Sequence, residues 1–331
     1  MPYLPQIRIL VPSAQVSSYT TGVLSLPSAK GAFVPPLQRA LFAGGVHQSN
    51  GRTNQIDQID ITTGGTGVDF GDLLSTNSGS SACSSSTRCL FLGGYTGSNT
   101  NVIQYSTFST SGNTTDFGDL TVARERAASL SSSTRGICGG GNVGDNWNNT
   151  IDYVTIASTG NAIDFGDLTY ARPTFGSCAS PTRGVWGGGD TANQAGQNVI
   201  DYVTIASTGN AIDFGDLVVG NDNSVGGLSD STRGCFAGGS NSSFSILTIS
   251  YITIATTGNA GNFGNLSQGN SLKGTAGLTR GIFVGNRHTS DAANNIIDQL
   301  TIQTLGNATD FGELSFIVHN TAGSSSAHGG L

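Results

Sequence analysis

The chain has 331 residues, of which 49 are glycine and only 11% are charged, against about 25% in ordinary globular domains. Its formal net charge of −7 argues against nucleic-acid binding, which needs clustered lysine and arginine. The hydrophobic content of 36% is spread evenly, so the chain is expected to fold rather than to stay disordered.

Signals for export, membrane insertion or metal binding are not evident. The first 15 residues lack a basic segment followed by an apolar run, so no signal peptide is expected. No apolar run is long enough for a membrane-spanning helix. The cysteines lack Cys-x-x-Cys spacing and are expected to be free, buried thiols made in a reducing compartment: Cys83, Cys89, Cys138, Cys178 and Cys235.

One motif recurs with a period of 47 to 49 residues. Residues 151–168 return unchanged at 200–217, and copies of Asp-Phe-Gly-Asp-Leu end at Leu73, Leu120, Leu168, Leu217, Leu266 and Leu314. An arginine, usually within Ser-x-Thr-Arg-Gly, recurs with the same period at Arg39, Arg88, Arg135, Arg183, Arg233 and Arg280. Repeats of this length are typical of propellers and related arrays.

The repeat at 121–168 predicts four short antiparallel strands. Small residues at 127–133 suit a strand where space is tight, and a turn at 134–136 leads to a short strand ending in a glycine pair at 139–140. The β-branched and aromatic segment 150–157 predicts a third strand that is apolar on both faces, and residues 162–168 predict the fourth. Four strands without helical periodicity indicate an all-β propeller blade.

The two ends of the chain predict the number of blades. Residues 1–24 match the later part of a repeat and residues 315–331 match its beginning, which predicts a seventh blade closed by strands from both ends. Residues 1–331 then form one domain, with blades at about 25–73, 74–120, 121–168, 169–217, 218–266, 267–314, and 315–331 plus 1–24. The alternative is a six-bladed ring with an N-terminal arm.

These features resemble the kelch repeat of β-propellers. The resemblance rests on an arginine near the start of the repeat (Arg124), the glycine pair, Tyr153, and then Phe165 where kelch repeats usually carry tryptophan. The repeated sequence motif DFGDLTxAR followed by SSSTRG also resembles motifs of virion structural proteins of tailed bacteriophages, especially marine ones. This second resemblance implies a virion protein made in the host cytoplasm, with other virion proteins as partners.

The repeated charged residues are predicted to be structural. The aspartates of the motif are Asp69, Asp116, Asp164, Asp213 and Asp310, and Asn262 replaces the aspartate in a sixth copy. We expect repeated arginines and aspartates to meet between strands or adjacent blades, one pair per repeat. The tyrosines that recur at one strand position are expected to pack in the core: Tyr105, Tyr153, Tyr202 and Tyr251.

The variable segments between the glycine pair and the third strand predict a recognition surface. They are 46–53, 95–100, 141–148, 189–197, 240–246 and 287–294, and in a propeller they emerge on one face. Variable loops on a rigid scaffold commonly carry recognition, and aromatic and amide side chains suit glycans, although ordinary polar loop filler is the alternative. The candidate ligand-binding residues are His47, Arg52, Tyr95, Trp147, Asn148, Gln194, Phe244, Arg287 and His288.

No catalytic or metal-binding constellation is evident, because the four histidines are dispersed and lack ligand spacing. We therefore expect a non-enzymatic virion structural protein, at a tail fibre, tail tip or capsid surface, without cofactor, metal, nucleic acid or membrane insertion. Its loop face would bind host-surface glycans or dock to other virion proteins. A free-standing carbohydrate-binding or enzymatic propeller is the alternative.

Overall fold

The computed structural model describes residues 38–47, 51–173, 175–190, 197–221, 225–240, 245–267, 273–287 and 293–331, with the backbone alone at 286–287 and 293–294. These residues belong to the unit Leu37–Leu331. Their regular structure is β-strand and they contain no helix, which confirms the all-β prediction. Residues 1–24, which were predicted to complete a seventh blade, lie outside the described residues.

Six antiparallel four-stranded sheets form in the described part of the chain, and we number them in chain order. Sheet 1 consists of β29 (Ala322–Ser325), β1 (Arg39–Ala43), β4 (Gln55–Asp60) and β5 (Val68–Asp72). Sheet 2 consists of β6 (Ser81–Ser84), β7 (Arg88–Leu92), β8 (Val102–Thr107) and β9 (Thr115–Asp119). Sheet 3 consists of β10 (Ala128–Ser131), β11 (Arg135–Gly139), β14 (Thr150–Thr155) and β15 (Ile163–Asp167).

The remaining sheets follow the same order. Sheet 4 consists of β16 (Gly176–Ala179), β17 (Arg183–Gly187), β18 (Gln197–Thr204) and β19 (Ile212–Asn221). Sheet 5 consists of β20 (Val225–Ser229), β21 (Arg233–Gly238), β22 (Thr248–Thr253) and β23 (Gly261–Asn265). Sheet 6 consists of β24 (Lys273–Ala276), β25 (Arg280–Arg287), β26 (Ala293–Thr301) and β27 (Thr309–Glu313). Two small ribbons are β28 (Val318–His319), β2 (Val46–His47) and β3 (Gly51–Arg52), and β12 (Asn142–Val143) with β13 (Asn146–Trp147).

The four strands predicted for residues 121–168 are all present in sheet 3, with ends that differ by at most two residues. The main difference is that Arg135, predicted to lie in a turn, begins β11. The third strand is buried on both faces as expected, because Ile151 belongs to the core shared with sheet 4 and Val154 to the core shared with sheet 2. Each sheet therefore has a neighbour on either side of its third strand.

The predicted position of the C-terminal strand is wrong. Residues 322–325 form β29, which pairs with β1 in sheet 1, from Ala40 opposite Ser325 to Ala43 opposite Ala322. In the other sheets the strand of small residues directly precedes its arginine-bearing partner, whereas β1 receives this inner strand from the far end of the chain. The inner edge of β1 is thereby paired, which removes an open sheet edge.

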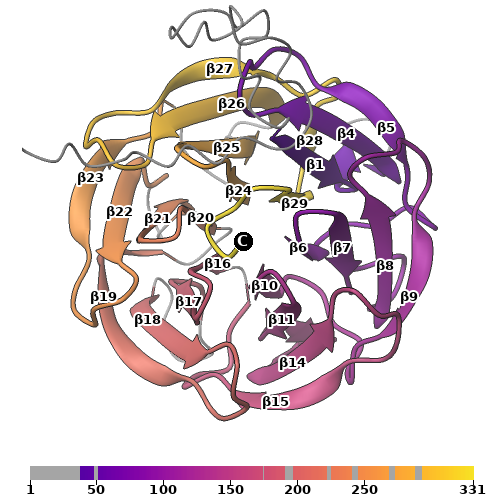
Figure 1. Cartoon of the computed structure of the whole chain (residues 1–331), viewed down its shortest axis with the longest axis horizontal. Coiled ribbons are helices and arrows are strands. Elements are labelled where there is room, and N and C mark those ends of the chain that lie inside the picture. The colour runs from indigo at the N-terminus through magenta and orange to yellow at the C-terminus, as the bar shows by residue number, and fades with distance from the viewer. Residues whose placement is uncertain are drawn as a thin grey trace, which may run out of the picture. The chain divides into compact units, whose positions relative to one another are not determined.

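The inner strands β6, β10, β16, β20, β24 and β29 contact one another in that order, and β29 contacts β6. Figure 1 shows them around a common centre, with the fourth strand of each sheet farthest out. Six hydrophobic clusters each join two neighbouring sheets, such as Phe165 with Trp186 between sheets 3 and 4, and Phe42 with Ile282 between sheets 1 and 6. This arrangement is consistent with a β-propeller-like fold.

The Asp-Phe-Gly motif lies on the outer strand, where the turn of the next sheet covers it. In sheet 3, Phe165 is buried, its carbonyl accepts a hydrogen bond from Gly209 of sheet 4 at 2.7 Å, and the Asp167 carbonyl accepts one from Ala211 at 2.7 Å. The amide of Asp167 donates to Asn210 Oδ1 at 3.1 Å. We call these contacts the edge clasp. Because they occupy the outer strand's free main-chain groups, they protect an edge that would otherwise be open.

The repeated arginines link neighbouring sheets without meeting the repeated aspartates, so the predicted Arg–Asp pairing is wrong. Arg88 Nη1 donates to the Ile156 carbonyl at 2.8 Å, and Arg135 Nη1 donates to the Ile205 carbonyl at 2.7 Å. The same bond joins Arg39 to Phe108, Arg183 to Ile254, Arg233 to Ile302 and Arg280 to Ile61. The aspartates Asp69, Asp116, Asp164, Asp213 and Asp310 are exposed. Exposure keeps each carboxylate hydrated, which a buried pair would forfeit.

The repeated tyrosines pack as predicted. Each meets the phenylalanine of its own Asp-Phe-Gly motif edge to face, for example Tyr153 and Phe165 with ring centroids 5.9 Å apart. On its other side the ring carries a repeated arginine, and the Arg135 guanidinium carbon lies 4.4 Å from the Tyr153 centroid. Both contacts are favourable geometries for aromatic rings. The recurring tyrosine thus connects the core to the bond between sheets.

Candidate functional site

The predicted recognition segments lie at one end of the sheets, between the second and third strands. Because each sheet is antiparallel, these segments are opposite the tight turns that join the third strand to the fourth. Residues 46–47 and 51–52 form the ribbon β2–β3, which also pairs with β28, and residues 142–147 form the ribbon β12–β13. The structure therefore gives these two segments regular hydrogen bonding.

Three of the segments contact one another across neighbouring sheets. The guanidinium carbon of Arg52, on the segment of sheet 1, lies 4.9 Å from the ring centroid of Tyr95, on the segment of sheet 2. Asn99 Nδ2 of sheet 2 donates to the Asn142 carbonyl of sheet 3 at 2.8 Å. We call the surface formed by residues 51–52, 95–100 and 142–148 the loop face. Arg52 and Tyr95 meet there as two of the predicted residues.

Trp147 and Asn148 have mainly structural contacts within the loop face. Trp147 is half-buried and pairs with Asn142 across the β12–β13 ribbon. Asn148 Oδ1 accepts a hydrogen bond from the Thr150 amide at 2.8 Å and lies 3.4 Å from Arg124 Nη1. Asn148 is thus engaged in fixing the segment, whereas the partly open Trp147 ring remains available for stacking.

The other predicted ligand-binding residues are not part of the loop face as defined above. Gln194, Phe244 and His288 lie outside the described residues, and Arg287 is described only by its backbone, which pairs with Ala293. His47 is half-buried in β2, opposite Val318 of β28. The loop face is therefore built from sheets 1 to 3.

The ion pairs that the structure does contain use residues outside the predicted set. Arg124 Nη2 meets Asp152 at 2.9 Å and Arg172 Nη2 meets Asp201 at 3.0 Å, with all four side chains fully buried. Arg124 and Arg172 follow the repeat leucine by four residues, and that position is Asn77 before sheet 2 and Asn221 at the end of β19, before sheet 5. After Asn77 and Asn221 the partner position holds Gln104 and Ser250 instead of aspartate, whereas Asn270 is followed by Asp298.

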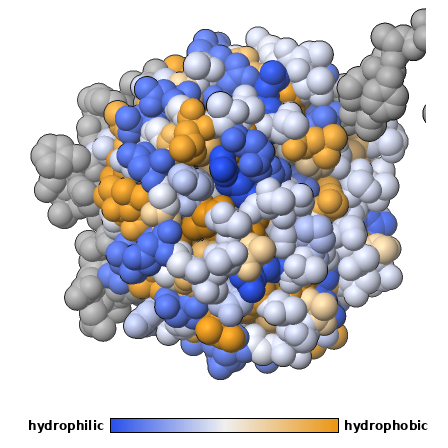
Figure 2. Space-filling model, turned by 60° about the vertical axis from the view of Figure 1, so that its left-hand side comes forward, coloured by the Kyte–Doolittle hydropathy of each residue, from blue (hydrophilic) through white to orange (hydrophobic). Residues whose placement is uncertain are grey.

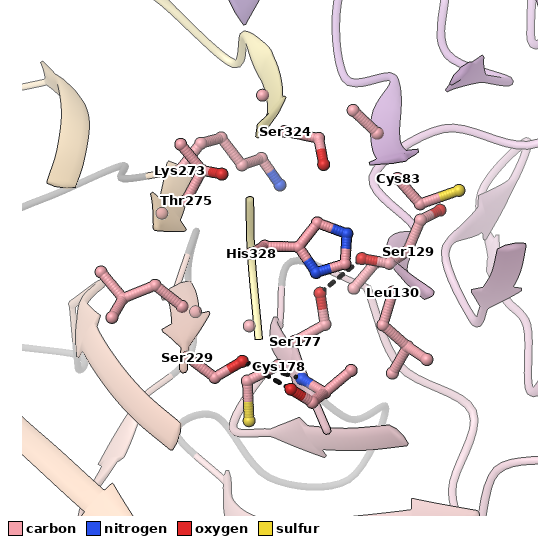
Figure 3. A pocket seen from close by; sticks show the side chains of 18 of the residues that line it. Cys83, Ser129, Leu130, Ser177, Cys178, Ser229, Lys273, Thr275, Ser324 and His328 are labelled. Atoms are coloured by element: carbon pink, nitrogen blue, oxygen red, sulfur yellow. Dashed lines mark hydrogen bonds between the residues drawn. The ribbon is translucent and has the colours of Figure 1, made fainter. Parts of the chain in front are cut away.

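A second polar region is a cavity lined by the inner strands. The space in it that the centres of water-sized molecules can occupy has a volume of about 70 Å³. Figure 3 shows serine hydroxyls, Lys273, Thr275 and His328 around it. Several of the hydroxyls are already used: Ser177 donates to the Ser129 carbonyl at 2.7 Å, and Ser229 donates to the Ala179 carbonyl at 2.8 Å. Sequence reasoning missed this cavity because it is assembled from all six sheets.

His328 lies within the cavity, where its hydrogen bonds fix the neutral ring. Nδ1 accepts from the Gly330 amide at 3.0 Å, so the proton is on Nε2, which lies 3.0 Å from Ser131 Oγ and 3.2 Å from the Ser84 carbonyl. Loss of hydration lowers the pKa of His328 to about 4, although the bond to Ser84 opposes the shift. His328 thus connects sheets 2 and 3 as an uncharged group at neutral pH.

The remaining histidine, cysteine and acidic side chains were compared with the geometry of a metal site. No group of three histidine, cysteine, aspartate or glutamate side chains in the described part of the chain has this geometry. All five cysteines are free and buried, as predicted, and burial raises the pKa of Cys83, Cys89, Cys178 and Cys235. The described residues also contain no helix able to span a membrane.

Large apolar side chains exposed on the described surface include Val68, Ile163, Ile212, Leu278 and Leu305. Figure 2 shows apolar groups on one side of the molecule as separate patches among polar ones. Isolated exposed apolar residues are normal for a soluble surface. They do not define a second site.

The chain matches no protein-family model and no curated protein at a level that indicates common descent.

Proposed function

We propose that the six sheets close into a six-bladed β-propeller in which β29 completes the first blade. The proposal is supported by the contacts between sheets 6 and 1, which are of the same kinds as those between other neighbours. Arg280 Nη1 donates to the Ile61 carbonyl at 2.8 Å, and the Gly67 amide donates to the Glu313 carbonyl at 2.7 Å, as in the edge clasp. Ser315 binds Asp57 as Thr121 binds Asp152.

We further propose that this propeller is a non-enzymatic structural component of a phage particle, at a tail fibre, tail tip or capsid surface. Its loop face would bind a host-surface glycan or another virion protein. The virion assignment rests on the resemblance between the repeated sequence motif and those of phage virion structural proteins. The geometry adds that the repeated polar residues serve the scaffold, whereas the residues that differ between repeats are at one end.

The observation that carries the recognition role is the continuity of the loop face over three sheets. Arg52 on Tyr95 and Asn99 on Asn142 join segments that lie far apart in the sequence. A surface of aromatic, guanidinium and amide groups held by such contacts is preorganised, which reduces the entropic cost of binding. Its combination of flat rings and hydrogen-bonding groups fits a sugar ring or a polar protein surface.

Binding of the purified chain to a glycan array and to whole bacterial cells tests the recognition role. Trp147→Ala is expected to reduce saturable binding at least tenfold, the effect of losing about 1.4 kcal/mol. Leu305→Ala is the control, because Leu305 is exposed at the opposite end of sheet 6. Equal effects of the two substitutions would contradict recognition through the loop face, and no binding by the folded wild type would favour docking to other virion proteins.

Mass spectrometry of purified, nuclease-treated particles tests the virion assignment separately. Peptides of this chain are expected at a constant ratio to the major particle proteins through successive density gradients. Their loss during purification would overturn the assignment, whatever the glycan array shows.

A further inference from the structure

Lys273 places a positive charge in the cavity enclosed by the inner strands. It begins β24, lines the cavity and is half-buried, so that solvent still reaches it. Figure 3 shows its side chain extending into the cavity near His328. Among the described residues its ammonium group makes no hydrogen bond or ion pair, and no aspartate or glutamate side chain lines the cavity. An ammonium group in such surroundings lacks a counter-charge.

Thr275 provides an unused hydroxyl beside it. Lys273 and Thr275 are two positions apart on one strand, so their side chains leave β24 on the same face. Thr275 is 3% exposed and lines the cavity, and its hydroxyl has no hydrogen-bond partner among the described residues. Since the residue lines the cavity, this hydroxyl is available to a molecule bound there.

The other groups that face the cavity leave the positive charge unopposed. His328 is neutral at pH 7, with both ring nitrogens engaged. The thiols Cys83 and Cys178 stay protonated because burial raises their pKa. Loss of hydration lowers the pKa of Lys273 to about 8, which leaves it mostly protonated at neutral pH. The cost of the buried charge is what a small anion would relieve.

We propose that the central cavity binds a small oxyanion, such as phosphate, sulfate or a short carboxylate, between the Lys273 ammonium and the Thr275 hydroxyl. The ammonium supplies a charge-assisted hydrogen bond and the hydroxyl supplies a second donor. A water needs about 10–15 Å³ of such accessible volume, and the cavity has about 70 Å³. This is sufficient for a small anion. The inference is independent of the proposed virion role.

The test is NMR of the full chain labelled with ¹³C,¹⁵N-lysine, because Lys30 is the other lysine of the chain and gives a reference signal. The ¹³Cε signal of Lys273, assigned from its absence in Lys273→Gln, is titrated with pH in chloride, phosphate, sulfate or acetate at equal ionic strength. An oxyanion is expected to raise the Lys273 titration midpoint by about one unit or more, because it favours the charged form. The Lys30 midpoint is expected to stay unchanged.

Two variants locate the site. Thr275→Val removes the hydroxyl at nearly constant volume and is expected to weaken phosphate binding about three- to tenfold, the loss of one hydrogen bond. Arg126→Gln removes a surface cation with a 43% exposed side chain and is expected to change nothing. A Lys273 signal that is indifferent to every oxyanion, or that shifts equally with Lys30, overturns the proposal. This readout needs only the folded wild type, so it holds even if Lys273→Gln fails to fold.

Discussion

At the scale of single residues, the fully buried arginines and their aspartate partners in the described part of the chain meet an opposite charge, as in Arg124–Asp152 and Arg172–Asp201. Arg124 and Asp152 are both fully buried, and Arg124 Nη2 also donates to the Cys138 carbonyl at 3.1 Å. Asp57 occupies the position of Asp152 in sheet 1 without an arginine. Burial raises its pKa, although hydrogen bonds from Ser315 oppose the shift. One strand position therefore accepts aspartate, glutamine or serine according to its surroundings.

The Arg124–Asp152 pair gives a test that uses the variation between repeats. Arg124→Asn and Asp152→Ser each leave one buried group unpaired, and each is expected to lower the free energy of unfolding by about 3–5 kcal/mol. The double variant carries the residues that the chain has at Asn221 and Ser250, the equivalent positions of another repeat, so its loss is expected to be clearly smaller than the sum. Urea denaturation of the four proteins measures this. Strictly additive losses would show that the two side chains do not depend on each other.

His328 predicts a dependence of stability on pH. Its pKa is about 4 in the folded chain and about 6.5 in the unfolded chain, so the unfolded state takes up the proton first as pH falls. Stability is therefore complete above about pH 6.5 and is lost as pH falls toward 4. Because the ring is half-buried, we expect a loss of about 1–2 kcal/mol between pH 7 and pH 5. His328→Gln should show a smaller loss over this range in thermal melts, and an equal loss would exclude His328 as the titrating group.

At the scale of elements, the edge clasp explains why the Asp-Phe-Gly motif and the Gly-Asn turn recur together. Gly166 has φ +146°, and a Cβ atom there would lie 2.5 Å from the Gly209 carbonyl oxygen of the next sheet. Gly209 itself has φ +155° and open space around it. The first glycine is needed for the close approach of two backbones, and the second for the conformation of the turn.

Two glycine substitutions separate these effects. Gly166→Ala and Gly160→Ala impose similar backbone strain, since their φ angles are +146° and +155°, but only the first introduces a contact with a neighbouring sheet. We expect Gly160→Ala to cost about 1–2 kcal/mol from strain alone and Gly166→Ala to cost about 1–3 kcal/mol more, as in an overpacked site. Thermal unfolding of the two variants compares them. Equal melting temperatures would mean that the edge clasp accommodates the added methyl group of Gly166→Ala without a further loss of stability.

The strands themselves were predictable from the sequence, because alternation, β-branched residues and glycine pairs are local signals. The partner of each repeated arginine was not predictable, since it is a main-chain carbonyl and leaves no mark in residue identity. The same holds for β29. Residues 322–325 were correctly matched to an inner strand of small residues. Whether this strand pairs with β1 or belongs to a seventh sheet depends on the number of sheets, which the local sequence does not specify. Two predicted residues of the loop face, Arg52 and Tyr95, do meet, whereas the site at Lys273 needs strands from every repeat.

At the scale of the whole molecule, the inner strand β29 holds sheet 1 and the centre together. Removing residues 322–331 leaves the inner edge of β1 without four paired residues. At about 1 kcal/mol for each lost ladder bond, the loss is about 4 kcal/mol or more, and the open edge is expected to promote oligomers. Removing only 327–331 keeps β29 and is the control. Calorimetry with light scattering compares the two truncated proteins. Equal melting temperatures would assign the loss of stability to residues 327–331 instead of to β29.

The pairing of β29 with β1 also determines the order of events when the protein is made. The Arg39 amide bonds to Ser326 Oγ, 287 residues further along the chain. At 5–20 residues per second, these groups leave the ribosome roughly 15 to 60 s apart. Sheets 2 to 6 each consist of contiguous residues and can form as they emerge, since local contacts fold quickly. Sheet 1 is completed last, so the inner edge of β1 stays unpaired and open to other chains for most of synthesis, and slower elongation lengthens that exposure.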